Sequence, residues 1–173
     1  DEIYEEEKPL FEVQAYMDFS KHIGGTKATD ELVQACKITK DSNVLDVGCG
    51  VGQTPVYLAQ KYGCKVTGID VSARMIKRAI ERKEKKNATR TTFLVADASD
   101  ILPFEDDTFD IVMTESVLNF IEDKEKALQE FKRVAKQGGY IRLNEVYLIN
   151  DEREPPERVL DSLNNSDFFQ AEI

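Results

Sequence analysis

Short apolar runs alternate with longer segments of helical period between about Val44 and Leu148. The short runs are rich in Val, Ile and Leu, which is typical of strands that are buried on both faces of a sheet. Because strands and helices that alternate along a chain build parallel sheets, the pattern predicts an α/β fold with a mostly parallel sheet flanked by helices. The predicted strands cover residues 43–47, 65–69, 92–96, 110–114 and 140–147.

Capping residues mark the helices that follow the first two strands. Thr54 and Pro55 have side chains typical of a helix N-terminus, and Gly63 is expected to end this helix in a left-handed conformation. Ser72 is expected to cap the next helix. The apolar side chains of that helix recur at helical spacing and predict one buried face, made of Met75, Ile76, Ala79 and Ile80.

Two further helices are predicted at the ends of the alternating region. Leu32, Val33 and Cys36 indicate a helix that covers the sheet and precedes the first strand. The helix before the last strand is expected to end at the glycine pair 138–139. Its predicted inward-facing side chains are Ala127, Leu128, Phe131 and Val134.

The region of alternating strands and helices lies between two flanking segments. We expect residues 1–40 to form an N-terminal helical cap over the ligand site, residues 41–150 the core, and residues 151–173 a C-terminal segment on the substrate side.

The 33 acidic side chains exceed the 23 basic ones, for a net charge of −10. This charge argues against a nucleic-acid-binding module, whose affinity comes largely from basic side chains. No apolar run approaches the roughly 20 residues of a membrane-spanning helix, so no membrane segment is predicted.

The cysteine and histidine content limits the chemistry of the site. Cys36, Cys49 and Cys64 are an odd number of cysteines without CxxC spacing, and His22 is the only histidine. This content favours a reducing compartment over a disulfide framework, so we expect a cytoplasmic protein. It also argues against a zinc site, and no metal is predicted.

Glycine and acidic residues follow the predicted strands at the end where ligands bind in parallel sheets. A glycine-rich turn lets the backbone approach a ligand closely, and an acidic residue about 20 positions later is suited to accept hydrogen bonds from both hydroxyls of a ribose. The pattern therefore predicts a cofactor that contains a nucleoside. The residues concerned are Gly48, Gly50 and Gly52 after the first strand, then Asp70, Asp97 and Glu115 after the next three.

The glycine spacing and one carboxylate argue against a dinucleotide. The spacing is GxGxG at residues 48–52, whereas dinucleotide sites are typically GxGxxG. Asp46 lies at the end of the first strand, where its carboxylate would repel a pyrophosphate but suit a cation. A nicotinamide-dependent enzyme is therefore the least favoured alternative.

Four ordered segments resemble the class I S-adenosylmethionine-dependent methyltransferases. Residues 44–52, VLDVGCGVG, resemble the first motif of that family, and residues 68–72, GIDVS, resemble its ribose-binding segment. Residues 96–98, ADA, are similar to its adenine segment, and residues 138–140 to the turn into its fifth strand. The resemblance implies a Rossmann-like fold with S-adenosyl-L-methionine as cofactor and S-adenosyl-L-homocysteine as product.

The same resemblance implies a role for each site residue. Asp46 and the nearby glycine backbone would hold the aminoacyl end of the cofactor, Asp70 would bind both ribose hydroxyls, and Asp97 would accept from the adenine amino group. The backbone near the end of the fourth strand would line the methionine side. The full set of implied cofactor-binding residues is Asp46, Gly48, Cys49, Gly50, Gly52, Asp70, Val71, Met75, Asp97, Ala98, Glu115 and Ser116.

The resemblance implies methyl transfer by in-line displacement to a small-molecule acceptor, but no catalytic residue stands out. Tyr16, His22 and Asn119 are candidates for contact with the acceptor. One alternative is an RNA or protein methyltransferase, which the eight basic and two acidic residues of segment 74–90 would favour. The other is a module that binds S-adenosylmethionine without catalysis.

The end of the sequence leaves little room for the rest of such a domain. Family members usually continue the sheet beyond the fifth strand, whereas 25 residues follow Leu148 here. We therefore expect the C-terminal strands of the usual seven-stranded sheet to be missing. The fifth strand would then be an exposed edge, which could pair with a second copy in a homo-oligomer.

Overall fold

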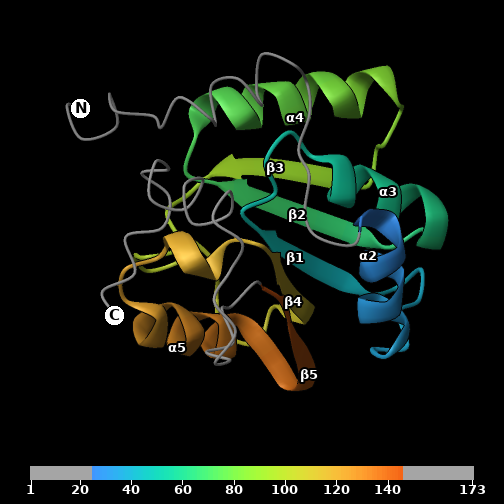
Figure 1. Cartoon of the computed structure of the whole chain (residues 1–173). Coiled ribbons are helices and arrows are strands. Elements are labelled where there is room, and N and C mark those ends of the chain that lie inside the picture. Colours follow the sequence, from blue (N-terminus) through green and yellow to red (C-terminus); the bar gives the residue numbers. More distant parts are fainter. Residues whose placement is uncertain (1–24, 146–173) are drawn as a thin grey trace, which may run out of the picture.

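A five-stranded parallel sheet forms the centre of the molecule, in the strand order β3-β2-β1-β4-β5 (Figure 1). The computed structural model describes residues 25–145. The five strands and the order of elements agree with the sequence prediction and confirm the α/β fold. The strands are β1 Asn43–Val47, β2 Lys65–Asp70, β3 Thr91–Val95, β4 Phe109–Glu115 and β5 Ala135–Asn144.

Strand β1 lies at the centre, and the order of the strands reverses beside it. Val47 pairs with Ile69 of β2 on one side and with Thr114 of β4 on the other, so the three carboxyl ends lie at one edge of the sheet. The chain leaves β1 and β4 in opposite directions, which creates the crevice where ligands bind in open α/β sheets. The fold therefore places the predicted site residues of these strands together.

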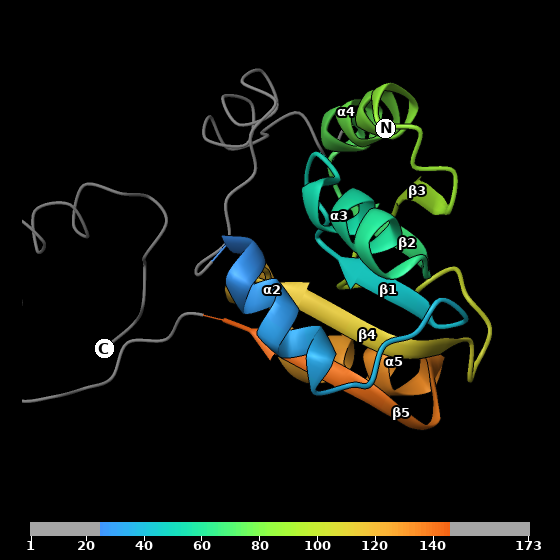
Figure 2. The same cartoon turned by 90° about the vertical axis from the view of Figure 1, so that its right-hand side faces the viewer.

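Helices cover both faces of the sheet. Helices α2 (Gly25–Gln34), α3 (Gln53–Tyr62) and α4 (Ala73–Lys85) lie on one face, and α5 (Lys124–Val134) lies on the other (Figures 1 and 2). A short 3₁₀ helix, η1 (Leu118–Phe120), follows β4. Within residues 25–145, no helix is both long and apolar enough to cross a bilayer.

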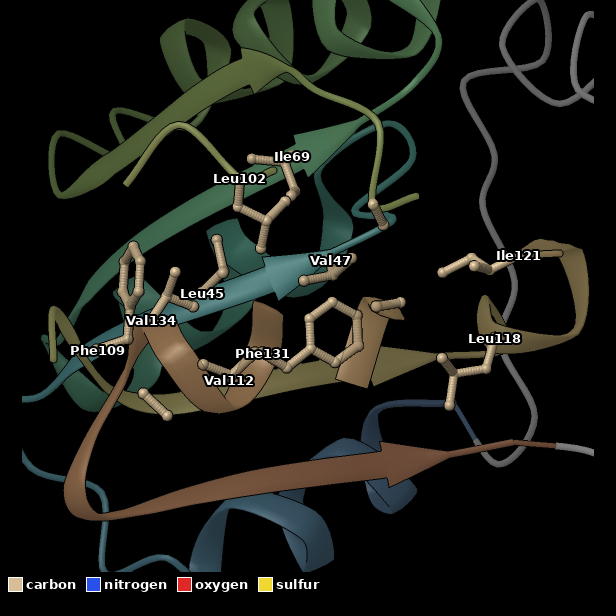
Figure 3. Close-up of a cluster of buried hydrophobic side chains, with 13 residues drawn as sticks. Leu45, Val47, Ile69, Leu102, Phe109, Val112, Leu118, Ile121, Phe131 and Val134 are labelled. Atoms are coloured by element: carbon tan, nitrogen blue, oxygen red, sulfur yellow. The ribbon is translucent and has the colours of Figure 1, made fainter. Parts of the chain in front are cut away.

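The alternation of side chains along the strands builds a core on each face. Leu45 and Val47 point toward α5, where they meet Phe131, while Val44 packs on the opposite face with Val33 of α2. Figure 3 shows the first cluster, in which side chains from the loops after β3 and β4 complete the layer. These are Leu102, Leu118 and Ile121. The loops next to the site are thus part of the packed core.

Of the cap predictions for the helices after β1 and β2, two are confirmed and one is wrong. Ser72 caps α4 by accepting a hydrogen bond from the Met75 amide at 3.3 Å, and Gly63 ends α3 with a φ of 69°. The N-cap of α3 is Gly52, with a φ of 76°, and its helix begins before Thr54. The hydroxyl of Thr54 instead donates to a side chain of the site.

Other details of the helices and of β5 differ from the predictions. Leu128 and Ile80 are 36% and 41% exposed, because the stripe that each helix buries is narrower than its apolar face. Glycines 138–139 lie inside β5, which begins at Ala135, and a register shift against β4 accommodates them. Among the strands of residues 25–145, β5 lies at one edge of the sheet, and both its exposure and its pairing with a second copy stay predictions.

Candidate functional site

The glycine loop after β1 folds back over the end of β2. The amides of Gly48 and Cys49 both donate to the Ile69 carbonyl, at 2.8 and 2.9 Å. Gly48, Gly50 and Gly52 all have positive φ values, of 73°, 52° and 76°. Glycine adopts this conformation without steric cost, so the three glycines give a loop whose backbone lies at the carboxyl edge of the sheet. The glycine-rich turn predicted after the first strand is therefore present, and its contact with a ligand stays a prediction.

Asp70, the last residue of β2, is held on both sides by backbone amides. Its Oδ2 accepts from the Gly50 amide and its Oδ1 from the Ser72 amide, each at 2.9 Å. A carboxylate accepts hydrogen bonds, and the hydroxyl groups of a ribose are donors of the matching kind. The contacts fix its carboxylate between the glycine loop and the start of α4.

The segment after β3 lies beside Asp70. The Ala96 amide donates to the Asp70 carbonyl at 3.1 Å, and the Ser99 amide donates to Asp97 Oδ1 at 2.8 Å. Ala98 is buried in the core cluster under α5. The structure thus brings residues 96–98 next to the end of β2, where the sequence places the adenine side of the cofactor.

Two apolar members of the implied cofactor-binding set have different surroundings. Val71 is 44% exposed at the end of β2, whereas Met75 is 3% exposed and packs against Val51. Val71 therefore has an exposed apolar surface, and Met75 packs against the glycine loop through Val51.

Asp46 is a buried carboxyl group in an acidic environment. It is 3% exposed and precedes Val47, the last residue of β1. Burial raises its pKa well above the usual 3.8, and the nearby carboxylates of Glu115 and Asp70 raise it further. This concentration of negative charge favours a cationic ligand and disfavours a phosphate.

Glu115 is the last residue of β4, and its carboxylate accepts hydrogen bonds from hydroxyl groups on two different helices. Thr29 of α2 donates to its Oε1 at 2.9 Å, and Thr54 of α3 donates to its Oε2 at 3.0 Å. Sequence reasoning missed both threonines, since they lie 86 and 61 residues from Glu115. Glu115 was expected near the methionine side of the cofactor, and the structure places it beside Asp46.

Ser116 has an unusual backbone and a buried hydroxyl. Its φ is 63°, and its amide donates to the Asn144 carbonyl at 2.8 Å. The hydroxyl oxygen is buried and has no hydrogen-bond partner among residues 25–145. A buried polar atom of this kind costs free energy unless a ligand or solvent satisfies it, so its position is consistent with a ligand site.

Glu145 fixes the segment after β4 and was missed by sequence reasoning. Its carboxylate accepts from the amides of Val117 and Leu118, at 3.1 and 3.2 Å, and from the Thr114 hydroxyl at 2.5 Å. These contacts hold the segment that carries Asn119, which is exposed in η1. The acceptor-side roles of Tyr16 and His22 stay predictions, because both lie outside the described residues.

The cysteines do not provide a reactive group at the site. Cys36, Cys49 and Cys64 are buried free thiols. Burial raises the pKa of the Cys49 thiol, and Asp46 and Asp70 raise it further, so Cys49 stays protonated and fills space under the loop. In the part of the chain that the structure describes, no group of three or more His, Cys, Asp or Glu side chains could hold a metal.

The sheet topology, the glycine loop and the carboxylates at the strand ends define a Rossmann-like domain suited to a nucleoside ligand that carries positive charge. Comparison with known proteins agrees with this class. Residues 38–169 match the family described as “Methyltransferase domain”, and the chain belongs to this family. The resemblance to S-adenosylmethionine-dependent methyltransferases is confirmed at the level of the family.

Curated relatives include enzymes that are much longer than this chain. An uncharacterized protein of Haemophilus influenzae is 33% identical over 133 residues, which cover 76% of this chain and 53% of that protein. Phosphoethanolamine N-methyltransferase 1 of Zea mays is 34% identical over 122 residues, which cover 70% of this chain and 24% of that enzyme. The chain thus spans about half or less of the length of these relatives.

Solved structures share the fold over most of the described domain. The MccD protein is 28% identical with a TM-score of 0.77, and the match covers 88% of this chain and 66% of that one. The [4+2]-cyclase SpnF is 29% identical with a TM-score of 0.66, over 69% of this chain and 44% of that one. The phosphoethanolamine N-methyltransferase 2 of Haemonchus contortus, solved with S-adenosyl-L-methionine, is 26% identical with a TM-score of 0.67, over 77% and 31% of the two chains.

Proposed function

We propose that this domain binds S-adenosylmethionine at the carboxyl edge of β1, β2 and β4 and transfers its methyl group to a small-molecule acceptor. The observation that carries the proposal is the position of Asp70. Its carboxylate is tied to the Gly50 amide of the glycine loop and the Ser72 amide at the start of α4. It therefore lies at the carboxyl edge of the sheet beside the glycine loop, the position expected of a ribose-binding group.

The chemistry of the other site residues fits the same cofactor. Asp70 would hold the ribose, and the exposed side chain of Val71 would lie against the adenine with Asp97 at its amino group. Asp46 and Glu115 supply negative charge for an ammonium or sulfonium group. The buried Ser116 hydroxyl and nearby backbone would face the methionine side, in keeping with its lack of a partner within residues 25–145.

The bound cofactor supplies a methyl group that is already activated by its sulfonium centre. The chain then has to hold the acceptor in line with that methyl group and to exclude water. The segment after β4, held by Glu145, is the described part of the chain best placed for this task. A general base is required only for an acceptor that arrives protonated.

A nitrogen nucleophile on a small molecule is the first acceptor to test. Relatives include N-methyltransferases named for phosphoethanolamine and for norajmaline, the latter from Rauvolfia serpentina and 41% identical over 103 residues. The RNA alternative loses support because part of the basic segment 74–90 is engaged in the fold. Arg82 donates to the Val51 carbonyl at 2.9 Å, and Arg78 pairs with Glu81 at 3.0 Å.

The similarity to SpnF favours one second candidate. That protein is named as a [4+2]-cyclase and has the same fold, so the fold alone does not determine methyl transfer. A module that binds S-adenosylmethionine and does not transfer its methyl group would therefore have the same site. Binding and turnover have to be measured separately.

Calorimetric titration with S-adenosylhomocysteine tests the binding site. Asp70→Ala is expected to weaken binding by about 1.5–3 kcal/mol, roughly ten- to hundredfold, because charge-assisted hydrogen bonds are lost. Asp110→Ala is the matched control: Asp110 also accepts a backbone amide, from Asn43 at 2.8 Å, but lies at the other edge of the sheet. Unchanged affinity in Asp70→Ala would refute the proposed ribose site.

Turnover with a panel of amines and alcohols then separates the two candidate functions. Formation of S-adenosylhomocysteine that depends on an amine supports methyl transfer to nitrogen. Tight binding of the cofactor without turnover across the panel supports the non-catalytic module. Turnover stimulated by RNA, with a steep dependence on salt, would instead indicate a nucleic-acid acceptor.

A further inference from the structure

The carboxylate of Glu115 joins three elements around the proposed cofactor site. It belongs to the last residue of β4 and accepts hydrogen bonds from the hydroxyl groups of Thr29 on α2 and Thr54 on α3. Thr29 is 1% exposed and Glu115 is 9% exposed, so the contact between them is buried. A buried hydrogen bond to a charged group is stronger than an exposed one between neutral groups.

The Thr29 hydroxyl is directed to Glu115 rather than to its own helix. Its distance to the Gly25 carbonyl, one turn earlier, is 3.5 Å, against 2.9 Å to Glu115 Oε1. A hydroxyl has one proton to donate, and the shorter contact with the charged acceptor is the favourable one. The two threonine contacts stabilise the carboxylate without removing its charge, which still raises the pKa of Asp46.

Helix α2 has a second polar attachment that lies away from the site. Asp30 accepts from Tyr57 at 2.8 Å and from Tyr62 at 2.9 Å, and it pairs with Lys61 at 2.6 Å, all on α3. Adjacent residues of α2 therefore bind different partners. Asp30 attaches the helix to α3, whereas Thr29 attaches it to the end of β4, beside Asp46.

Of the two attachments of α2, the one through Thr29 lies at the proposed cofactor site. Figure 2 shows that the N-terminal end of α2 lies near the arrowhead of β4, at the carboxyl edge of the sheet. We infer, on the basis of the proposed function, that Glu115 is a positioning residue: through Thr29 it holds the N-terminal end of α2 against the aminoacyl side of the cofactor site. Thr29 and Glu115 then act as one unit in cofactor binding, and Asp30 does not take part.

Substitutions of Thr29 test the inference by titration with S-adenosylhomocysteine and by thermal unfolding of the free protein. Thr29→Val removes the hydroxyl with little change of shape and is expected to weaken binding about tenfold. Thr29→Ser restores the hydroxyl and should bind within about twofold of the unchanged protein. Tyr57→Phe removes a hydrogen-bond donor to Asp30, which lies next to Thr29 on α2. This variant should keep the dissociation constant within about twofold, whatever its effect on Tm.

A double-mutant cycle shows whether Thr29 acts through Glu115. Glu115→Gln removes the charge, and adding Thr29→Val to it should weaken binding by less than threefold, since the shared contact is already altered. The inference is overturned if Thr29→Val lowers Tm but keeps the affinity, or if Tyr57→Phe weakens binding as much as Thr29→Val. A failure of the unchanged protein to bind S-adenosylhomocysteine would refute the proposed function instead, so the two failures are distinct.

Discussion

Val117 packs directly on Gly48, so that a β-carbon at Gly48 would lie 2.3 Å from Cγ2 and 2.8 Å from Cγ1 of Val117. Gly48 also has a φ of 73°, which residues with side chains rarely adopt. Through this contact the segment after β4 packs on the glycine loop after β1. Two sides of the proposed cofactor site therefore meet at a point that only glycine can occupy.

We predict that Gly48→Ala disrupts both the fold and the site. Backbone strain of about 1–2 kcal/mol adds to about 1–3 kcal/mol of overpacking against Val117. Urea unfolding should show a loss of about 2–5 kcal/mol, and binding of S-adenosylhomocysteine should fall more than tenfold.

Gly138→Ala is the matched control for this substitution. Gly138 has a φ of 78°, but a β-carbon there would meet nothing within 4 Å. The variant should lose only the strain, about 1–2 kcal/mol, and keep its affinity for S-adenosylhomocysteine. Equal loss of binding in the two variants would show that the contact with Val117 is not what shapes the site.

Glu145→Ala is predicted to release the segment after β4. The amides of Val117 and Leu118 lose their acceptor, so their hydrogen exchange should become faster by at least tenfold. Binding of S-adenosylhomocysteine should weaken severalfold, because Val117 also packs on Gly48. Exchange is measured by NMR or mass spectrometry.

Asp123→Ala serves as the comparison for Glu145→Ala. Asp123 also accepts a backbone amide, from Lys126 at 2.9 Å, at the start of α5. Its loss should speed exchange in α5 and leave residues 117–118 protected. Unchanged exchange at 117–118 in Glu145→Ala would show that this segment is held by other contacts.

Arg133→Ala is predicted to destabilise the loop between β3 and β4. The guanidinium donates to the carbonyls of Leu102 and Phe104, at 3.0 and 2.8 Å, and pairs with Glu130 at 2.7 Å. Its removal leaves the two carbonyls without this donor, so urea unfolding should show a loss of about 2–3 kcal/mol. Arg133→Lys keeps the charge but lacks the planar fork, and should lose about half as much.

Arg90→Ala provides the control for Arg133. Arg90 donates to the Lys40 carbonyl at 3.0 Å in an exposed position, where the expected loss is about 0.5 kcal/mol or less. If the two alanine variants lost equal stability, the role assigned to the Arg133 network would be wrong.

The strands and the glycine loop could be predicted from local sequence because their signals are local. Apolar runs mark β1, β2 and β4, and glycines with Asp70 mark the carboxyl edge. The start of β5 could not be predicted in this way. Glycines 138–139 have the pattern of a helix end, and only the shifted register against β4 shows that they belong to the strand.

The hydrogen bonds that organise the site could not be predicted, because their partners are distant in sequence. Thr29 and Glu115 are 86 residues apart, and Thr114 and Glu145 are 31 apart. A threonine or glutamate has no local spacing that identifies such a partner. Thr54 shows the difficulty: next to Pro55 its residue type indicates an N-cap, yet its hydroxyl binds Glu115.

Asp46→Asn is predicted to stabilise the free protein at neutral pH while weakening cofactor binding. Because the folded state raises the pKa of Asp46 above 3.8, the unfolded chain ionises at a lower pH than the folded one, so stability falls as the pH rises from about 3.8 to the folded pKa. The variant should gain about 0.5–2 kcal/mol at pH 7 by thermal unfolding, and the gain should vanish near pH 3. Affinity for S-adenosylhomocysteine should fall severalfold, since its ammonium loses a carboxylate.

Asp110→Asn should show the opposite dependence on pH. Burial alone would raise the pKa of Asp110, but Lys136 and the Asn43 amide outweigh it and the net shift is downward. Its ionised form therefore stabilises the fold above pH 3.8, and this contribution is lost as the pH falls through the lowered pKa. The variant should be less stable at pH 7, with unchanged cofactor affinity. If Asp46→Asn were also destabilising at pH 7, the Asp46 carboxylate would stabilise the fold. The interpretation that it lowers the stability of the free protein and serves to bind a cation would then be wrong.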